Sequence, residues 1–93
     1  MRYGVDKMHH YLKCAPKQFQ PVYDKRMKAI VRQNDRNYQV GDTVTLKEGW
    51  PGVEGFDYTG RDVSARIAHL DDFGCQHGYV NLSLDDIGML IVK

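Results

Sequence analysis

The 93-residue chain has 42% hydrophobic and 27% charged residues, which is the composition of an ordinary globular protein and argues against intrinsic disorder. A chain of this length is expected to form one domain, residues 1–93, with one compact core. No apolar run approaches the roughly 18 residues of a membrane span, and the first ten residues lack the apolar segment of a secretory signal. These features predict a cytoplasmic protein without a membrane partner.

Charge is distributed unevenly along the sequence, although the formal net charge is only +1. Residues 1–40 hold nine Lys or Arg and three Asp, a net charge of +6, whereas residues 41–93 hold four Lys or Arg and nine Asp or Glu, a net charge of −5. A fold that keeps the first half on one side would present a basic face that attracts phosphates. If the two halves interleave, the charges cancel, and the sequence leaves both possibilities open.

Neither the cysteines nor the histidines have the spacing of a disulfide framework or a metal site. Cys14 and Cys75 are far apart and form no Cys-x-x-Cys pair, so we expect two free thiols that pack as small apolar side chains. A structural zinc site usually needs four closely spaced Cys or His ligands. The histidines, which lack such spacing, are His9, His10, His69 and His77. We therefore expect no metal and no other cofactor.

The first third of the sequence predicts a strand followed by a helix. Residues 9–14 alternate weakly and indicate a strand, and Pro16 suits the first turn of a helix. A narrow apolar stripe at helical spacing follows, formed by Phe19, Val22 and Tyr23. Pro21 lies inside this helix and removes a backbone donor, which predicts a short or kinked helix.

The next segment, residues 27–33, is expected to be a strand with one apolar face. Period two places Met27, Ala29 and Val31 on the face that we expect to be buried. The opposite face then carries Lys28, Ile30 and Arg32. Asp35 and Asp42 are expected to form turns, because Asp side chains bond their own main chain. After the second of these turns, a strand is expected with Val44 and Leu46 on one face.

The second half of the sequence predicts short strands joined by glycine-containing turns. Residues 49–60 hold four glycines and one proline, which indicates a loop or a wide hairpin. Further strands are expected over 61–70, 79–84 and 89–92. The apolar face of the first of these carries Val63, Ala65 and Ile67, and His69 continues it as an expected core histidine. Five or six short strands with one helix indicate a barrel or a sandwich.

Short motifs follow one another in a fixed order over residues 9–84. They are His10-x-Leu12-Lys13, Arg32-x-Asn34-Asp35-Arg36-x-Tyr38-Gln39-Val40-Gly41-Asp42, Leu46-x-Glu48, Tyr58-Thr59-Gly60-Arg61 and Gly78-Tyr79-Val80-x-Leu82. In this order they resemble a phage and bacterial branch, of unknown function, of the ASCH family in the PUA-like superfamily. The resemblance implies an α+β fold: a small PUA-like β-barrel of five to six strands, with one helix after the first strand and a cleft beside it. Related domains bind RNA, and one branch hydrolyses acetylated cytidine nucleosides.

The ASCH motif itself, Gly-x-Lys-x-x-Glu-x-Arg, is only partly present. When the motif is registered on Arg32, its lysine and glutamate fall on Met27 and Ile30. A small amidohydrolase would need a lysine and a carboxylate for proton transfer and for positioning water. Met27 and Ile30 supply neither. We therefore expect that the catalytic groups of the family are lost and that binding remains.

The expected binding surface is a basic cleft for RNA or a modified nucleotide. Lys28 and Arg32 flank Ile30 on one strand face, where a cationic pair could hold a phosphate beside a base; alternatively both cations lie in solvent and their stems cover Ile30. Arg36 could contact a phosphate, and Tyr38 could stack on a base or serve as a barrel aromatic. The complete expected set is Lys13, Arg26, Lys28, Arg32, Asn34, Arg36 and Tyr38.

Two further classes of function remain open. The first is a small amidohydrolase or ribonuclease whose catalytic groups come from elsewhere in the chain, such as Glu48 or His69. The second is a phage-encoded protein-interaction module that inhibits a host nucleic-acid enzyme, with Trp50 and the acidic half as its contact surface. Convergence of Lys28, Arg32 and Arg36 on one cleft would favour the nucleic-acid reading.

Overall fold

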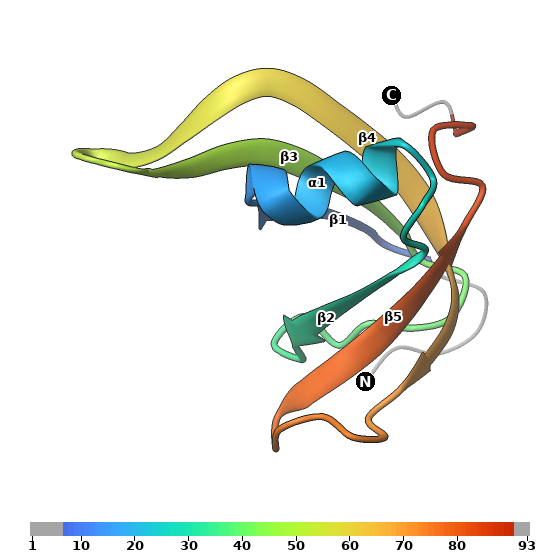
Figure 1. The fold of residues 1–93 in the computed structure, drawn as a ribbon. Coiled ribbons are helices and arrows are strands. Elements are labelled where there is room, and N and C mark those ends of the chain that lie inside the picture. Colours follow the sequence, from blue (N-terminus) through green and yellow to red (C-terminus); the bar gives the residue numbers. More distant parts are fainter. Residues whose placement is uncertain (1–6, 91–93) are drawn as a thin grey trace.

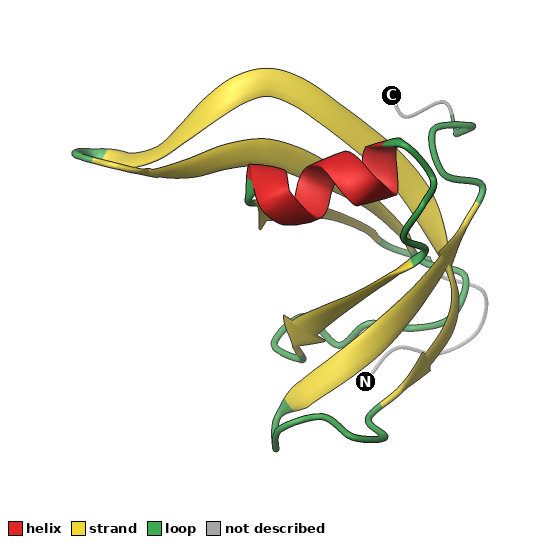
Figure 2. Ribbon diagram, viewed as in Figure 1, coloured by secondary structure: helices red, strands yellow, loops and turns green. Residues whose placement is uncertain are grey.

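The computed structural model describes residues 7–90, which form a curved sheet of five strands with one helix (Figures 1 and 2). The elements in chain order are β1 (His9–Cys14), α1 (Pro16–Tyr23), β2 (Ala29–Gln33), β3 (Thr43–Gly52), β4 (Gly55–Asp71) and β5 (Tyr79–Asp85). The expected α+β class is confirmed, as is the position of the helix directly after the first strand. The helix lies on the concave side of the sheet (Figure 1).

The sheet is mixed and open. Its strand order is β1-β3-β4-β5-β2, in which β1 and β3 are parallel and every other neighbouring pair is antiparallel. The two edge strands, β1 and β2, do not pair with each other, so the expected closure into a barrel is not observed among the described residues. The first and third elements of the chain therefore lie at opposite edges of the sheet.

Helix α1 is short because its sequence favours its start and weakens its middle. Pro16 occupies the first turn, where its missing N–H costs nothing. Pro21 lies inside the helix and cannot donate a helical hydrogen bond, and the helix ends two residues later at Tyr23. Phe19 and Val22 are fully buried against the inner face of the sheet. The apolar stripe expected from the sequence thus attaches the helix to the core.

The inner face of the sheet supplies most of the core. Alternation on β3, β4 and β5 is confirmed, because the side chains expected to face inward are buried on all three strands. These are Val44, Leu46, Val63, Ala65, Ile67, Val80, Leu82 and Leu84. Leu12 and Cys14 extend the same face on β1. Both Cys14 and Cys75 are free thiols.

The expected orientation of the 27–33 strand is wrong. Ile30 is only 2% exposed and lies opposite Leu82 of β5, whereas Val31 is 47% exposed and Ala29 is also exposed. Met27 precedes the strand and only partly packs against the core. Both phases of this strand offer apolar residues, so the inward phase is set by its partner strand rather than by its own pattern.

His69 does not continue the core face of β4. The pairing of β4 with β5 shifts register between Ile67 and His69, so the side chain after the shift points to the other side. The His69 side chain is 66% exposed, and its Nε2 lies 3.2 Å from Asp71 Oδ2. The prediction of a core histidine is therefore wrong.

Residues 49–60 form a hairpin rather than a loop, which we call the arm. β3 and β4 continue into it and pair until Gly52 and Gly55, so it extends beyond the rest of the sheet (Figure 1). Gly49 is required where the two strands approach closely, because a Cβ at this position would collide with the Asp57 carbonyl oxygen. The expected strand over 89–92 is also not found: Met89 lies in a turn, Leu90 has no strand structure, and residues 91–92 lie outside the described residues.

Candidate nucleic-acid interface

A hollow of about 220 Å³ lies where the two edge strands approach each other. It is lined by Leu12 and Lys13 of β1, by Arg32 and Gln33 of β2, and by Asp35, Arg36 and Tyr38 of the following segment. We call it the seam hollow. Four of the seven residues expected to bind nucleic acid therefore share one cavity: Lys13, Arg32, Arg36 and Tyr38.

Arg32 spans the gap between the sheet edges. Its Nη2 donates to the Lys13 carbonyl on β1 at 3.3 Å, and its Nη1 donates to Gln18 Oε1 of the helix at 2.7 Å. The side chain starts on β2 beside the buried Ile30 and is itself half-buried. The guanidinium thus holds β1, α1 and β2 together and forms a fixed cationic wall of the hollow.

Of the two arginines that line the seam hollow, Arg36 is the more accessible. Its side chain is exposed, and its Nε lies 3.8 Å from Asp35 Oδ1, which is a long and solvent-screened ion pair. Little free energy is needed to turn this guanidinium toward an incoming anion. Lys13 differs, because its Nζ lies 5.6 Å from the centroid of the Phe56 ring on the arm. Lys13 therefore lines the hollow, while its ammonium group lies toward the arm.

Tyr38 is a wall of the hollow rather than an exposed stacking surface. The residue is buried, and its ring packs edge-on against His10 with a centroid separation of 4.8 Å. Burial raises the pKa of the Tyr38 hydroxyl, so the ring carries no charge near neutral pH. Of the two roles open to it from the sequence, the structure favours the packing role.

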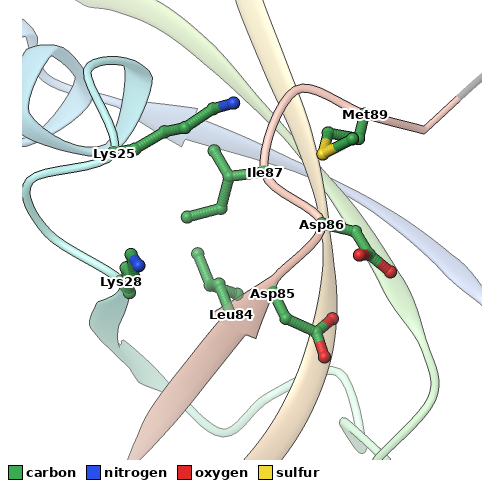
Figure 3. A pocket seen from close by; sticks show the side chains of 7 residues that line it. All are labelled: Lys25, Lys28, Leu84, Asp85, Asp86, Ile87 and Met89. Atoms are coloured by element: carbon green, nitrogen blue, oxygen red, sulfur yellow. The ribbon is translucent and has the colours of Figure 1, made fainter.

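The other expected contacts lie elsewhere. Arg26 is exposed and pairs with Asp24 at 3.2 Å, and Asn34 uses its backbone N–H to bond the Gly78 carbonyl. Lys28 lines a separate hollow of about 240 Å³ with Lys25 (Figure 3). The expectation that Lys28 shares a cleft with Arg32 and Arg36 is wrong: Lys28 lies just before β2 and lines the other hollow.

The second hollow has an apolar floor between two charged sides. Leu84 and Ile87 lie between the lysines and the aspartates, and Asp85 and Asp86 point away from the lysines in Figure 3. Asp86 is engaged by Arg66, whose Nε lies 3.3 Å from its carboxylate. This hollow contains a residue of the expected site, Lys28, but none of the other cations of that set.

A bidentate ion pair that the sequence did not predict lies at the base of the arm and contacts the helix. Arg61 Nε and Nη2 donate to the two oxygens of Glu48 at 2.9 and 3.0 Å, and Thr59 Oγ1 donates to the same carboxylate at 2.8 Å. Arg61 Nη2 also donates to Gln20 Oε1 of α1 at 2.6 Å. The guanidinium lies 5.1 Å from the ring centroids of both Phe19 and Tyr23. One feature of the sequence pointed to this pair. Glu48 follows Leu46 by two residues, so strand alternation places its carboxylate on the inner face, where it needs a partner.

This pairing makes Glu48 a poor candidate for acid–base chemistry. The hydrogen bonds from Arg61, and then that from Thr59, hold the pKa of the Glu48 carboxyl below its usual range. A general acid or base near neutral pH needs a carboxyl pKa raised toward 7. His69, the other residue proposed for catalysis, is exposed beside Asp71, eight residues after Arg61 on β4.

We expect the purified protein to show no appreciable hydrolysis of acetylated cytidine. Met27 and Ile30 stand at the motif positions of the lysine and glutamate, and Glu48 is held ionised by Arg61. Incubation with the acetylated nucleoside and separation of the products by chromatography checks this. Sustained turnover that Glu48→Gln abolishes would contradict it.

A buried polar cluster underlies the segment between β2 and β3. The carboxylate of the fully buried Asp42 lies 2.9 Å from His10 Nε2. It also accepts the backbone N–H groups of Met8 and Gln39, each at 3.1 Å. The carboxylate therefore fixes the turn before β3, as expected from its sequence position, and ties it to β1.

Residues 9–84 match a family model described as "Domain of unknown function (DUF3850)". The chain belongs to this family. It is also 41% identical, over 63 residues, to an uncharacterized 12.9 kDa protein in the GpA 3′ region of Escherichia phage P2. That match covers 68% of this chain and 54% of the phage protein, so the chain spans about half the length of this relative. The expected kinship with a phage-associated family of unknown function is confirmed.

Two other properties concern the described part of this DUF3850 domain. No three His, Cys, Asp or Glu side chains come together as metal ligands within residues 7–90. Nor does that part contain a helix with the length and hydrophobicity to cross a bilayer.

Proposed function

We propose that this DUF3850 domain binds RNA or a modified nucleotide at the seam hollow. The arrangement of Arg32 and Arg36 around a cavity with one apolar wall, Leu12, supports this reading. Arginine suits phosphate because its planar guanidinium donates two parallel hydrogen bonds. A nucleotide would place its phosphate at these cations and its base or sugar against the apolar wall.

The proposal includes the finer kinship expected from the sequence. An open sheet with a helix on its concave side, and the motif order over residues 9–84, are consistent with a PUA-like fold of the ASCH type. The resemblance implies a cleft beside the first helix, and the seam hollow, lined by Leu12, Lys13 and Arg32, fits that place. A cytoplasmic location is part of the same proposal. Two free thiols fit a reducing compartment, and the proposed RNA ligand fits the same location.

Arg36→Gln tests the proposal most directly. Fluorescence anisotropy with labelled single-stranded RNA at low and moderate salt is expected to show weak, salt-sensitive binding by the unmodified protein. Loss of one charge-assisted phosphate contact is expected to weaken binding about tenfold and to lower the salt slope by about one. The fold should be unaffected because the side chain is exposed.

Arg26→Gln is the matched control. It removes the same charge from an exposed site outside the seam hollow, where Arg26 pairs with Asp24, so affinity should stay within about twofold of the unmodified protein. Equal losses in the Arg26 and Arg36 variants would mean that binding depends on net charge and not on the seam hollow.

Exposure on the arm favours a second candidate, a protein-interaction module. Trp50 is half-exposed and Val53 is fully exposed near the tip of the arm. Tryptophan is over-represented among the residues that dominate binding energy at protein interfaces. Absence of any RNA binding at low salt would favour this candidate, and a Trp50→Ala variant would then be the first to examine with a protein partner.

A further inference from the structure

The outer face of β1, β3 and β4 carries aromatic, hydroxyl and basic side chains in place of a simple solvated surface. Strand pairing arranges these side chains in rows: His9 beside Thr43, Tyr11 beside Thr45 and Ser64, and Lys13 beside Lys47 and Asp62. Phe56 and Tyr58 of the arm continue this face, since the two lysines lie over their rings. We call this set the outer face.

The ring of Tyr11 is held in place by a hydrogen-bonded chain. His9 packs edge-on against it with a centroid separation of 4.7 Å. Both nitrogens of the His9 imidazole are engaged, Nδ1 with Thr43 Oγ1 at 2.5 Å and Nε2 with Thr45 Oγ1 at 2.7 Å. Tyr11 itself remains 54% exposed. It is therefore a pre-positioned aromatic surface, which loses little conformational freedom when a flat ligand covers it.

A second aromatic surface lies on the arm. Tyr58 is 51% exposed and packs edge-on against Phe56, with 5.0 Å between the ring centroids. The Nζ atom of Lys47 lies 5.7 Å from the Tyr58 centroid. Tyr11 is in register with Thr45 and Tyr58 with Gly49, so the two residues are offset by four positions of β3, about 13 Å at 3.3 Å per residue, and lie on opposite sides of that strand. Two separate bases can therefore stack at the same time.

The charges of the outer face favour a polyanion over an apolar protein surface. Neither Lys13 nor Lys47 forms an ion pair within the described part of the chain, and Asp62 is the acidic side chain in their row. Cations between exposed aromatic rings are the arrangement by which proteins hold single-stranded nucleic acid. Hydroxyls of the same face, such as that of Ser64, offer hydrogen bonds to bases or to the 2′-hydroxyl.

We propose that the outer face binds single-stranded RNA by stacking two unpaired bases on Tyr11 and Tyr58, with Lys13 and Lys47 neutralising the phosphates between them. The inference rests on the proposed RNA binding and extends it. Lys13 both lines the seam hollow and lies on the outer face, so one strand can run from Arg36 across β1 to the arm.

Anisotropy with a labelled uridine oligonucleotide of about 15 nucleotides, long enough to reach both surfaces, tests this. Stacking on an aromatic ring contributes enough that each alanine substitution should weaken binding about tenfold, and the Tyr11→Ala/Tyr58→Ala double variant at least about fiftyfold. Tyr11→Phe and Tyr58→Phe keep the ring face and should retain affinity near that of the unmodified protein. Phe73→Ala, which removes an exposed aromatic from the loop between β4 and β5, is the control and should change nothing.

The outcomes separate the two proposals. If Arg36→Gln weakens binding but the double tyrosine variant does not, the outer face is not an RNA surface and the seam hollow stands alone. If the unmodified protein fails to bind the oligonucleotide at low salt, the outer-face proposal and RNA binding at the seam hollow are both overturned, and a modified nucleotide is left as the ligand of the hollow. Circular dichroism checks that the variants are folded. We expect that they are, because both tyrosines are half-exposed.

Discussion

Ile30→Glu is expected to unfold the protein or to lower its free energy of unfolding by at least about 3 kcal/mol. The Ile30 side chain is 2% exposed and lies opposite Leu82 in the core. A glutamate there must either bury a charge or keep its proton, and both options cost free energy. Lys28 is exposed, and the guanidinium of Arg32 is already bonded to Gln18 and to the Lys13 carbonyl. Neither cation is placed to compensate.

Val31→Glu provides a control at the next position of the same strand. Val31 is 47% exposed, so its replacement should change stability by no more than about 0.5 kcal/mol. Urea denaturation, followed by circular dichroism, measures both variants against the unmodified protein. Equal midpoints for Ile30→Glu and Val31→Glu would show that β2 does not place Ile30 in the core.

Asp42→Ala is expected to lower the free energy of unfolding by about 3 kcal/mol. The substitution removes the acceptor for His10 and for the backbone N–H groups of Met8 and Gln39, and the site is fully buried. A buried donor left without its acceptor costs about 1 to 3 kcal/mol. Thermal unfolding and urea denaturation both measure the loss.

Asp35→Ala is the corresponding control, since Asp35 is an exposed aspartate of the same segment. Within residues 7–90 its carboxylate pairs with Arg36, at 3.8 Å, and stability should change by less than about 0.5 kcal/mol. If the two aspartate variants unfolded at the same urea concentration, the buried cluster would not be a stabilising feature.

The phase of a strand could be predicted where polar residues separate its two faces, and not otherwise. On β4, Ser64 and Arg66 alternate with Val63, Ala65 and Ile67, and only one phase is apolar. On the 27–33 segment, Met27, Ala29 and Val31 compete with Ile30, so the choice depends on where β5 lies. His69 was misplaced for another reason, because a one-residue register shift is a property of the strand pair.

The same distinction holds for the residues of the candidate site, some of which could be predicted from the local sequence and some of which could not. Arg32 and Arg36 are near each other in the chain, and a turn motif in between made their shared location predictable. The Glu48–Arg61 pair was not, because it depends on the register between β3 and β4, and the glycines of residues 49–60 left both a loop and a wide hairpin open. Lys28, which the expected strand 27–33 placed on one face with Arg32, lies just before β2 and lines the other hollow, and its part in binding stays a prediction.

The strand order of the sheet has a consequence for synthesis of the chain. β2 is made early, but its neighbour within the described sheet is β5, in which Ser83 pairs with Ala29. At a translation rate of about 5 to 20 residues per second, roughly 3 to 11 seconds separate these two residues. During that interval β3 and then β4 are made and can pair with β1 and with each other, whereas β2 has no strand to pair with. A chain that stalls after β4 would therefore present this apolar segment to chaperones, or to a second nascent chain.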